Sequence, residues 1–247
     1  MIEPAQFDDP AHPTKPNPYF PLAVGNHWEF SAGNERDVVD IVDETKLIAG
    51  VRCAVARDIV SRDELVAEAT DDWYAPNKSG ATWYFGEEVK DFESFDGDMP
   101  KRPELVSIDG SFKAGRNGDK PGVIFLESPK VGDVYVEEAS LGNAEDVTEI
   151  LSTNYVYGNS PELDQLVPQA LVAALCGSGD CVVTKNFSLL EPGIFARKYY
   201  TKGIGVFLEI EPDVSKVIRL VSCNVDPRCA IPAAPPCRNP EELPREE

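Results

Sequence analysis

Residues 72–88 constrain the fold of this chain more than any other segment. Two aromatic runs, DWYA and TWYFGEE, flank the sequence PNKSG and contain two of the three tryptophans. Proline presets φ at a turn, and Asn and Gly tolerate positive φ. The segment therefore predicts a β-hairpin with two aromatic strands.

Polar and apolar residues alternate in long stretches on both sides of this hairpin. Val51, Cys53 and Val55 share one parity, whereas Arg52 and Asp58 share the other. This period of two is typical of an antiparallel strand with one buried face. We expect a partner strand at 64–74 and further strands at 105–113, 122–126, 133–139, 146–156, 181–190, 194–201, 204–210 and 214–223.

The segment 160–176 breaks the β pattern. Ser160 is a candidate N-cap followed by Pro161, and apolar residues then recur at helical spacing as far as Cys176. Pro168 should kink this helix. The predicted fold is mainly β, a curved antiparallel sheet or half-barrel with one kinked amphipathic helix, 160–176, packed across it.

Proline runs mark both ends of the chain. We expect 1–18 to be an extended Pro-rich arm, 19–223 a single β-rich domain, and 224–247 a Pro/Cys-rich tail. No repeat and no linker divides the central domain.

The charge balance limits the classes of partner. With 23 basic and 43 acidic residues the formal charge is −20, which repels phosphate backbones and anionic lipid surfaces. Nucleic acid is therefore not an expected partner. No apolar run reaches the roughly 18 residues of a membrane span.

The cysteines favour an oxidising compartment. Cys176 and Cys181 face each other across the short turn GSGD, so we expect them to form a disulfide. A zinc site is less favoured, since no pair has Cys-x-x-Cys spacing. The pairing of the other four cysteines, Cys53, Cys223, Cys229 and Cys237, is left open. One option is a bond from Cys53, in a predicted strand, to one of the three cysteines of the tail. The amino terminus lacks a signal-peptide pattern, so either the protein is cytoplasmic or the signal has been removed; the cysteines favour a secreted or periplasmic protein.

Several phrases resemble those of a known family. They are NPYFPL, GNHWEF, DWYA, WYFGE and LEPG with KYY, between residues 17 and 211. Together they are similar to a family of largely uncharacterised bacterial exported proteins. The resemblance implies a β-rich, often lipoprotein-like domain, and a half-barrel similar to periplasmic carriers of lipids and lipoproteins. It implies no catalytic residue, and the helix 160–176 and the cysteine-bearing tail depart from its pattern.

Motifs for enzymatic chemistry are scarce. The chain has no Gly-x-Ser-x-Gly elbow, no His-Glu-x-x-His and no dinucleotide fingerprint. If Asp71 faces inward, its pKa would rise and it could act as a general acid or base with Glu87 and Tyr84. If the register slips by one residue, Asp71 is solvated and Asp72 replaces it.

Aromatic residues supply the strongest functional signal. Five candidates for the lining of an apolar cavity are Trp28, Trp73, Trp83, Phe85 and Tyr199; in the alternative interpretation they fill a solid core. The acidic loop 91–98 offers oxygen ligands for Ca²⁺, but it lacks the order of an EF-hand and is better interpreted as a solvated loop. We predict neither a metal nor a cofactor.

Three functions are compatible with these features. The first is a secreted β-rich protein that binds a hydrophobic small molecule or lipid in an aromatic-lined cavity. The second is a cofactor-independent cyclase, isomerase or hydrolase that uses an inward carboxylate with a tyrosine. The third is an extracellular interaction module that contacts partners through its Pro-rich tails. The oligomeric state is left open.

Overall fold

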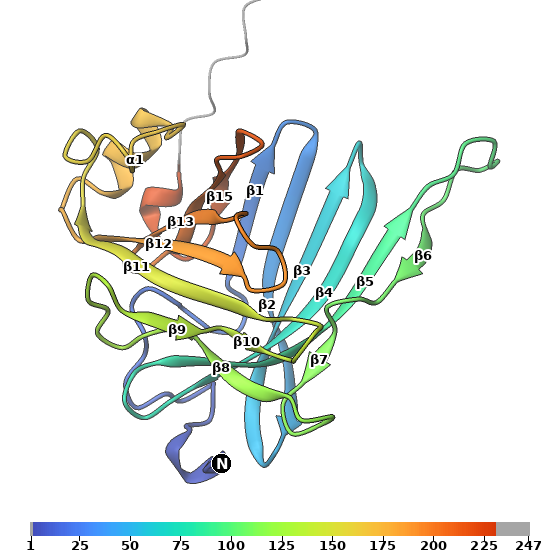
Figure 1. Cartoon of the computed structure of the whole chain (residues 1–247), viewed down its shortest axis with the longest axis horizontal. Helices are drawn as coiled ribbons and strands as arrows, with labels where there is room; N and C mark the ends of the chain where they lie inside the picture. The colour runs from blue at the N-terminus through green and yellow to red at the C-terminus, as the bar shows by residue number, and fades with distance from the viewer. Residues whose placement is uncertain (1, 231–247) are drawn as a thin grey trace, which may run out of the picture.

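The computed structural model describes residues 2–230 and shows an antiparallel sheet that is nearly closed into a barrel (Figure 1). This confirms the predicted fold class. The strands are β1 (His27–Ala32), β2 (Glu35–Ile48), β3 (Val51–Arg62), β4 (Leu65–Pro76), β5 (Thr82–Glu93), β6 (Glu104–Ser107), β7 (Phe112–Lys113), β8 (Lys120–Phe125), β9 (Val134–Val136), β10 (Glu138–Ala139), β11 (Asp146–Tyr155), β12 (Cys181–Ser188), β13 (Ala196–Thr201), β14 (Gly205–Glu211) and β15 (Lys216–Cys223).

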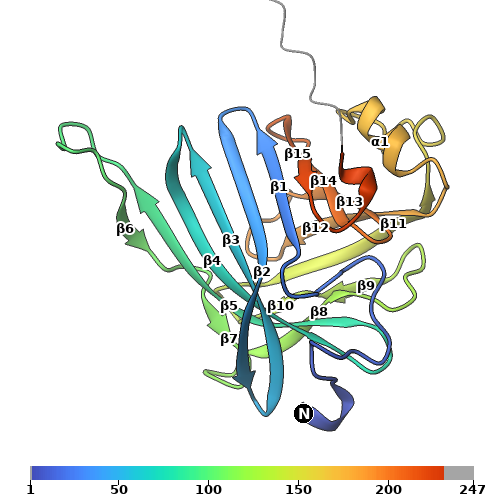
Figure 2. The ribbon, with the colours of Figure 1, turned by 180° about the vertical axis from the view of Figure 1, so that it is seen from behind.

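The strands follow one another as an antiparallel meander whose two ends meet. Strands β5 to β1 lie in sequence, β1 pairs with β15, and β15 to β11 complete the sheet. Figures 1 and 2 show the long strands β2–β5 as a fan with β1 at its edge, and the strands of the second half crossing beside them. The β5–β6 hairpin extends away from the body in both views.

Residues 134–139 close most of the remaining gap. β9 pairs with β11, and β10, two residues further on, pairs with β8. The close crossing depends on Gly122 of β8, where an added Cβ would lie 2.0 Å from the backbone oxygen of Glu137. A glycine at this point therefore lets the two edges of the barrel approach each other.

The aromatic hairpin is β4–β5, as the sequence predicts. Asn77 starts its turn: the Asn77 side-chain oxygen accepts a hydrogen bond from the Ser79 amide at 2.9 Å, and the Asn77 amide donates to the oxygen of Ala81 at 2.8 Å. Gly80 takes a φ of 106°, a conformation that is favourable only for glycine. The turn residues thus act as the sequence indicates.

The helix is shorter than expected. α1 spans Gln169–Leu175, and Pro168 is its N-cap. The prediction of a kinked helix from residue 160 is wrong in its bounds, because Pro168 marks the start of the helix, and residues before it form turns. α1 and the preceding turns pack on the outer side of β13, where the Tyr199 hydroxyl donates to the oxygen of Leu163 at 2.5 Å and Thr201 donates to the oxygen of Leu175 at 3.0 Å.

The amino-terminal arm lies against the barrel. It contains a short 3₁₀ turn, Pro4–Gln6, and Phe7 then forms a β-bridge with Asn77. Asn17 ties its end to the barrel by donating to the oxygens of Gly80 and Leu126, at 2.9 and 3.1 Å.

Two disulfides are present. Cys176–Cys181 is confirmed, and Cys223 pairs with Cys229 in a 3₁₀ turn, Pro227–Cys229, at the end of β15. Among the described residues, the suggested bond from Cys53 to a tail cysteine is not formed: Cys53 is a buried free thiol. Cys237 and the rest of 231–247 lie outside the described residues. No helix among residues 2–230 is long and apolar enough to cross a bilayer.

The long strands bury both faces. Inside the barrel, Trp28, Phe30 and Ile41 belong to the main hydrophobic cluster. Outside, Cys53 and Val55 pack with Trp73, Phe85 and other side chains beneath the arm. The arm thus creates a second core on the outer face of β3–β5.

Candidate functional site

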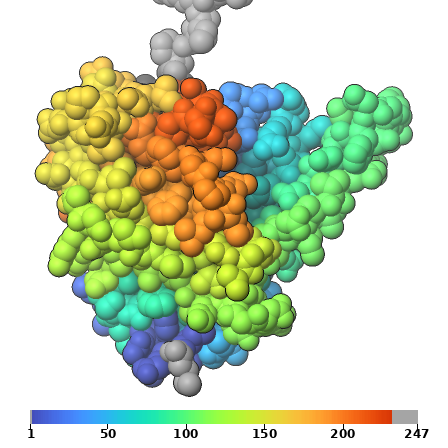
Figure 3. All heavy atoms as spheres, viewed as in Figure 1, coloured from blue at the N-terminus to red at the C-terminus, as the bar shows by residue number. Residues whose placement is uncertain are grey.

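Between its two halves the barrel contains a cavity of about 230 Å³ that opens to solvent. Its apolar end is formed by side chains of the segment after the arm, of β1–β4, of β8, and of β13–β15 with the turn between β13 and β14: Phe20, Pro21, Leu22, Trp28, Phe30, Val39, Ile41, Ala56, Tyr74, Ile124, Tyr200, Ile204, Val206 and Ile218. Trp28 is fixed there because its indole nitrogen donates to the backbone oxygen of Ile204 at 2.8 Å. Figure 3 shows the surface hollowed where the orange residues of the second half meet the blue-green strands of the first.

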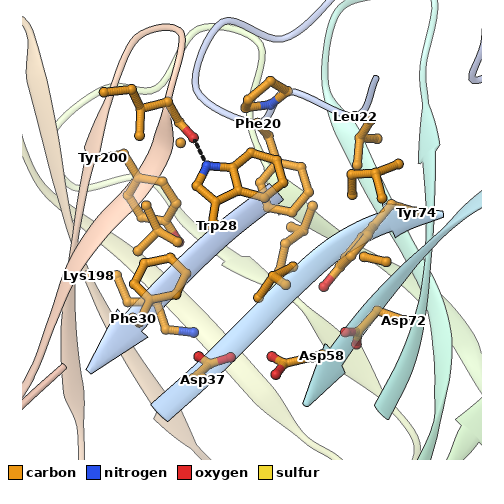
Figure 4. Close-up of a pocket in the computed structure, with 18 of the residues that line it drawn as sticks. Phe20, Leu22, Trp28, Phe30, Asp37, Asp58, Asp72, Tyr74, Lys198 and Tyr200 are labelled. Carbon is orange, nitrogen blue, oxygen red and sulfur yellow. Dashed lines mark hydrogen bonds between the residues drawn. The ribbon is translucent and has the colours of Figure 1, made fainter. Parts of the chain in front are cut away.

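Carboxylates form the other end of the cavity. Asp37, Asp58 and Asp72 come from the adjacent strands β2, β3 and β4, and Figure 4 shows them in one row, away from Phe20 and Trp28. Val39 pairs with Asp58 and Ala56 pairs with Asp72, so each carboxylate is the diagonal neighbour of the next. Diagonal neighbours on one face lie within reach of each other.

The register of β4 decides which of two adjacent aspartates faces the cavity. Asp72 and Tyr74 point inward, whereas Asp71 lies on the outer face. There the Arg57 Nε donates to Asp71 Oδ1 at 2.9 Å. The expectation that Asp71 is the inward carboxylate is therefore corrected to Asp72, the alternative register of the sequence.

A bulge in β5 places Tyr84 and Glu87, the predicted partners of the inward carboxylate, next to Asp72. Asp72 pairs with Glu87 and Tyr74 with Tyr84, so β5 has one extra residue between these pairs. Gly86 occupies the bulge with a φ of 122°, and an added Cβ would lie 2.2 Å from the oxygen of Phe112. The bulge places Tyr84 and Glu87 on the same inner side. The Tyr84 hydroxyl donates to Asp72 Oδ1 at 2.5 Å.

Burial changes the acidity of this region. It raises the pKa of Asp72 to about 7, against the opposing effect of the Tyr84 hydrogen bond. Burial likewise raises the pKa of Glu87 to about 9 and that of Glu138 to about 8. The low-polarity interior disfavours the ionised carboxylate, and neighbouring acids add to the effect.

Asp37 and Asp58 form a closely coupled pair. Burial raises the pKa of both carboxyls, and Asp58 rises furthest because the charge of Asp37 adds to its burial. The Oδ1 atoms of both residues are buried and have no hydrogen-bond partner among the described residues. Buried oxygens without a partner are costly and uncommon in folded proteins. A proton that the pair retains and shares between Asp37 and Asp58 offsets part of this cost.

Lys198 is the basic side chain at the cavity within residues 2–230. It pairs across β13–β14 with Glu209, and its Nζ lies 3.8 Å from Glu209 Oε2. The charge of Glu209 is the main reason that the pKa of Lys198 is raised. Lys198 and Glu209 also line a second cavity, of about 210 Å³, whose wall includes side chains of the segment 186–196.

The predicted aromatic residues divide between the two faces. Trp28 lines the cavity. Trp73, Trp83 and Phe85 instead pack in the outer cluster with Phe7 of the arm, at ring-centroid distances of 5.8 Å from Trp83 and 5.2 Å from Phe85. Tyr199 also faces outward, toward the turns that precede α1, and its neighbour Tyr200 lines the cavity in its place.

The sequence interpretation missed Asp37, Asp58, Lys198 and Glu209. Asp58 shares its parity with two arginines, which suggested a solvated face. The alanines at 54 and 56, on the same face, were the available signal, because small residues there leave space inside the barrel.

Metal chemistry finds no ready site in residues 2–230. Those residues contain no group of three or more His, Cys, Asp or Glu side chains placed to hold a metal ion.

Comparison with protein-family models, curated proteins and solved structures gives no match to this chain. The family resemblance of the motifs therefore stays a prediction.

Proposed function

We propose that this protein binds a small molecule with an apolar body inside the barrel. One observation carries the proposal: a cavity of about 230 Å³ with an aromatic end and a polar end. A concave apolar site with a few convergent polar groups is the usual form of a ligand pocket.

The volume limits the size of the ligand. A dry cavity of about 150 Å³ accepts benzene, so about 230 Å³ accommodates one or two rings or a short chain. We therefore narrow the expected hydrophobic ligand from a lipid in general to a molecule of this size.

Filling the cavity tests the proposal. Ala56→Leu adds three carbon atoms to the cavity wall, whereas Ala69→Leu adds them to β4 on the face of Asp71. Binding of naphthalene, followed by tryptophan fluorescence and by calorimetry, should weaken about tenfold or more in Ala56→Leu and stay unchanged in Ala69→Leu. Equal binding in all three proteins, or none in the wild type, would refute the proposal.

We propose the location of the protein from its disulfides. Cys176–Cys181 and Cys223–Cys229 favour a secreted or periplasmic protein, because such bonds persist in oxidising compartments. Peptide mapping of protein isolated with its thiols blocked should recover both bonds. Recovery of all four cysteines as blocked thiols would contradict this location.

A catalytic role is the second candidate. The hydrogen bond from Tyr84 to Asp72 at the cavity wall supports an acid–base pair, with Glu87 nearby. Asp72 carries this hypothesis in place of Asp71. On any substrate that the protein turns over, Asp72→Asn should lower kcat by at least about a hundredfold, and an unchanged kcat would reject the role.

A further inference from the structure

The negative charge of the carboxylate row is not balanced by basic side chains among residues 2–230. Asp37, Asp58 and Asp72 line the polar end of the cavity, and Lys198, the basic side chain there among the described residues, is paired with Glu209. The Tyr84 hydroxyl satisfies one oxygen of Asp72. The Oδ1 atoms of the other two aspartates are buried, and no group among residues 2–230 other than this pair itself serves them as a hydrogen-bond partner.

We propose that this polar end binds a protonated amine, whose ammonium group donates to Asp37, Asp58 and Asp72 while its apolar body lies against the aromatic end. The inference rests on the proposed function and names the ligand class. An ammonium group has three donors and no acceptor, which matches three carboxylates in a row. Charge-assisted hydrogen bonds of this kind are among the strongest in proteins.

The aromatic neighbours fit the same ligand. Phe30 and Tyr74 line the cavity beside the row, and Trp28 lies further along it toward the aromatic end, as Figure 4 shows. Ring faces attract a cation and also pack against an apolar body. An anionic ligand would instead meet three carboxylates and a lysine that is already paired with Glu209.

Proton exchange provides an independent sign of amine binding. Burial raises the pKa of Asp37 and Asp58, so the empty pair holds a proton at a pH where free aspartate has lost it. An ammonium group should displace that proton. The charged groups that act on this pair are Glu35, Glu68, Asp72 and Glu209, and Lys198 lines the same cavity.

The test compares ligands of nearly equal shape on the full-length protein. Calorimetry would use 2-phenylethylamine, 2-phenylethanol and phenylacetate, with methylamine as a control for attraction to the negative surface. The amine should bind at least about tenfold more tightly than the alcohol, phenylacetate should bind more weakly than either, and methylamine should not compete. In two buffers of different ionisation enthalpy, the amine should release protons and the alcohol should not.

Variants locate the amine. In Asp37→Asn/Asp58→Asn the amine should lose about tenfold or more in affinity while the alcohol is unchanged. Asp71→Asn, on the outer face, should bind both as the wild type does. If the double variant does not fold, Asp58→Asn alone and the ligand series on the wild type decide.

The two proposals fail in different ways. If the alcohol binds as tightly as the amine, or the amine binds the double variant unchanged, the cavity is a ligand site but the inference of an amine is wrong. If neither compound nor naphthalene binds, the proposed function fails as well.

Discussion

Asp72→Asn should reduce the loss of unfolding free energy that the wild type shows as the pH rises from 5 to 8. Burial raises the pKa of Asp72 to about 7 in the folded protein, compared with about 3.9 in an unfolded chain. The folded protein therefore binds more protons than the unfolded chain between these values. Stability from this group is fully present below about pH 4 and is lost as the pH rises through 7.

The size of the effect follows from the two pKa values. Between pH 5 and pH 8 the wild type should lose about 2–3 kcal/mol of unfolding free energy through Asp72 alone, at about 1.4 kcal/mol per pH unit. This is an upper value, because the side chain keeps some contact with the cavity and water there would reduce the shift. Glu87 and Glu138 act in the same direction, so the variant should retain part of the slope.

Urea unfolding at pH 5, 6, 7 and 8 measures this directly. Asparagine keeps the shape of the side chain and a partner for Tyr84, but it does not titrate. The matched control is Asp71→Asn, one residue away on the outer face, where Arg57 binds the carboxylate. Parallel curves for the wild type and Asp72→Asn, or a wild type that becomes more stable with rising pH, would show that Asp72 is not buried as described.

Three further changes test the fold. Gly86→Ala should destabilise the protein by ~2 kcal/mol or more in urea unfolding, because residue 86 has a φ of 122° and its Cβ would lie 2.2 Å from a backbone oxygen of β7. The control Gly25→Ala, at a positive φ with no atom within 4 Å, should destabilise it less. A larger loss of stability in Gly25→Ala than in Gly86→Ala would contradict the bulge. Phe7→Ala should cost ~2 kcal/mol and expose the outer cluster to proteolysis, because it removes a ring packed on two aromatic rings of β5; unchanged stability would mean that the arm does not form a core. The double variant Cys176→Ser/Cys181→Ser, which lacks the disulfide, should lower the unfolding free energy by about 2 kcal/mol, because the unfolded chain regains the entropy of the short closed loop. An unchanged urea midpoint would argue against this stabilisation by the disulfide.

The sequence predicts much of the fold because its signals are local. Turn residues in PNKSG define the β4–β5 hairpin, and alternation in 51–62 defines β3. The disulfide Cys176–Cys181 also follows from local spacing. The helix bounds were less accurate, since the apolar spacing of 160–168 resembles a helix although these residues form turns before Pro168.

The candidate site depends on contacts that alternation does not encode. A period of two separates the two faces of a strand, but it does not identify the inner face when both are buried. The arm covers the face of Cys53 and Trp73, which makes the outer side as apolar as a core. Asp58 and Asp72, on the polar parity, consequently face the cavity.

The sequence by itself determined the class of fold, the aromatic hairpin and one disulfide, because each arises from residues that are neighbours in the chain. Only the tertiary structure decided which carboxylates meet. Asp37, Asp58 and Asp72 come together through the pairing of three strands, and the bulge at Gly86 shifts Glu87 to their side. Register and bulges depend on packing between distant segments, and this packing converts a row of apparently solvated acids into the polar end of a cavity.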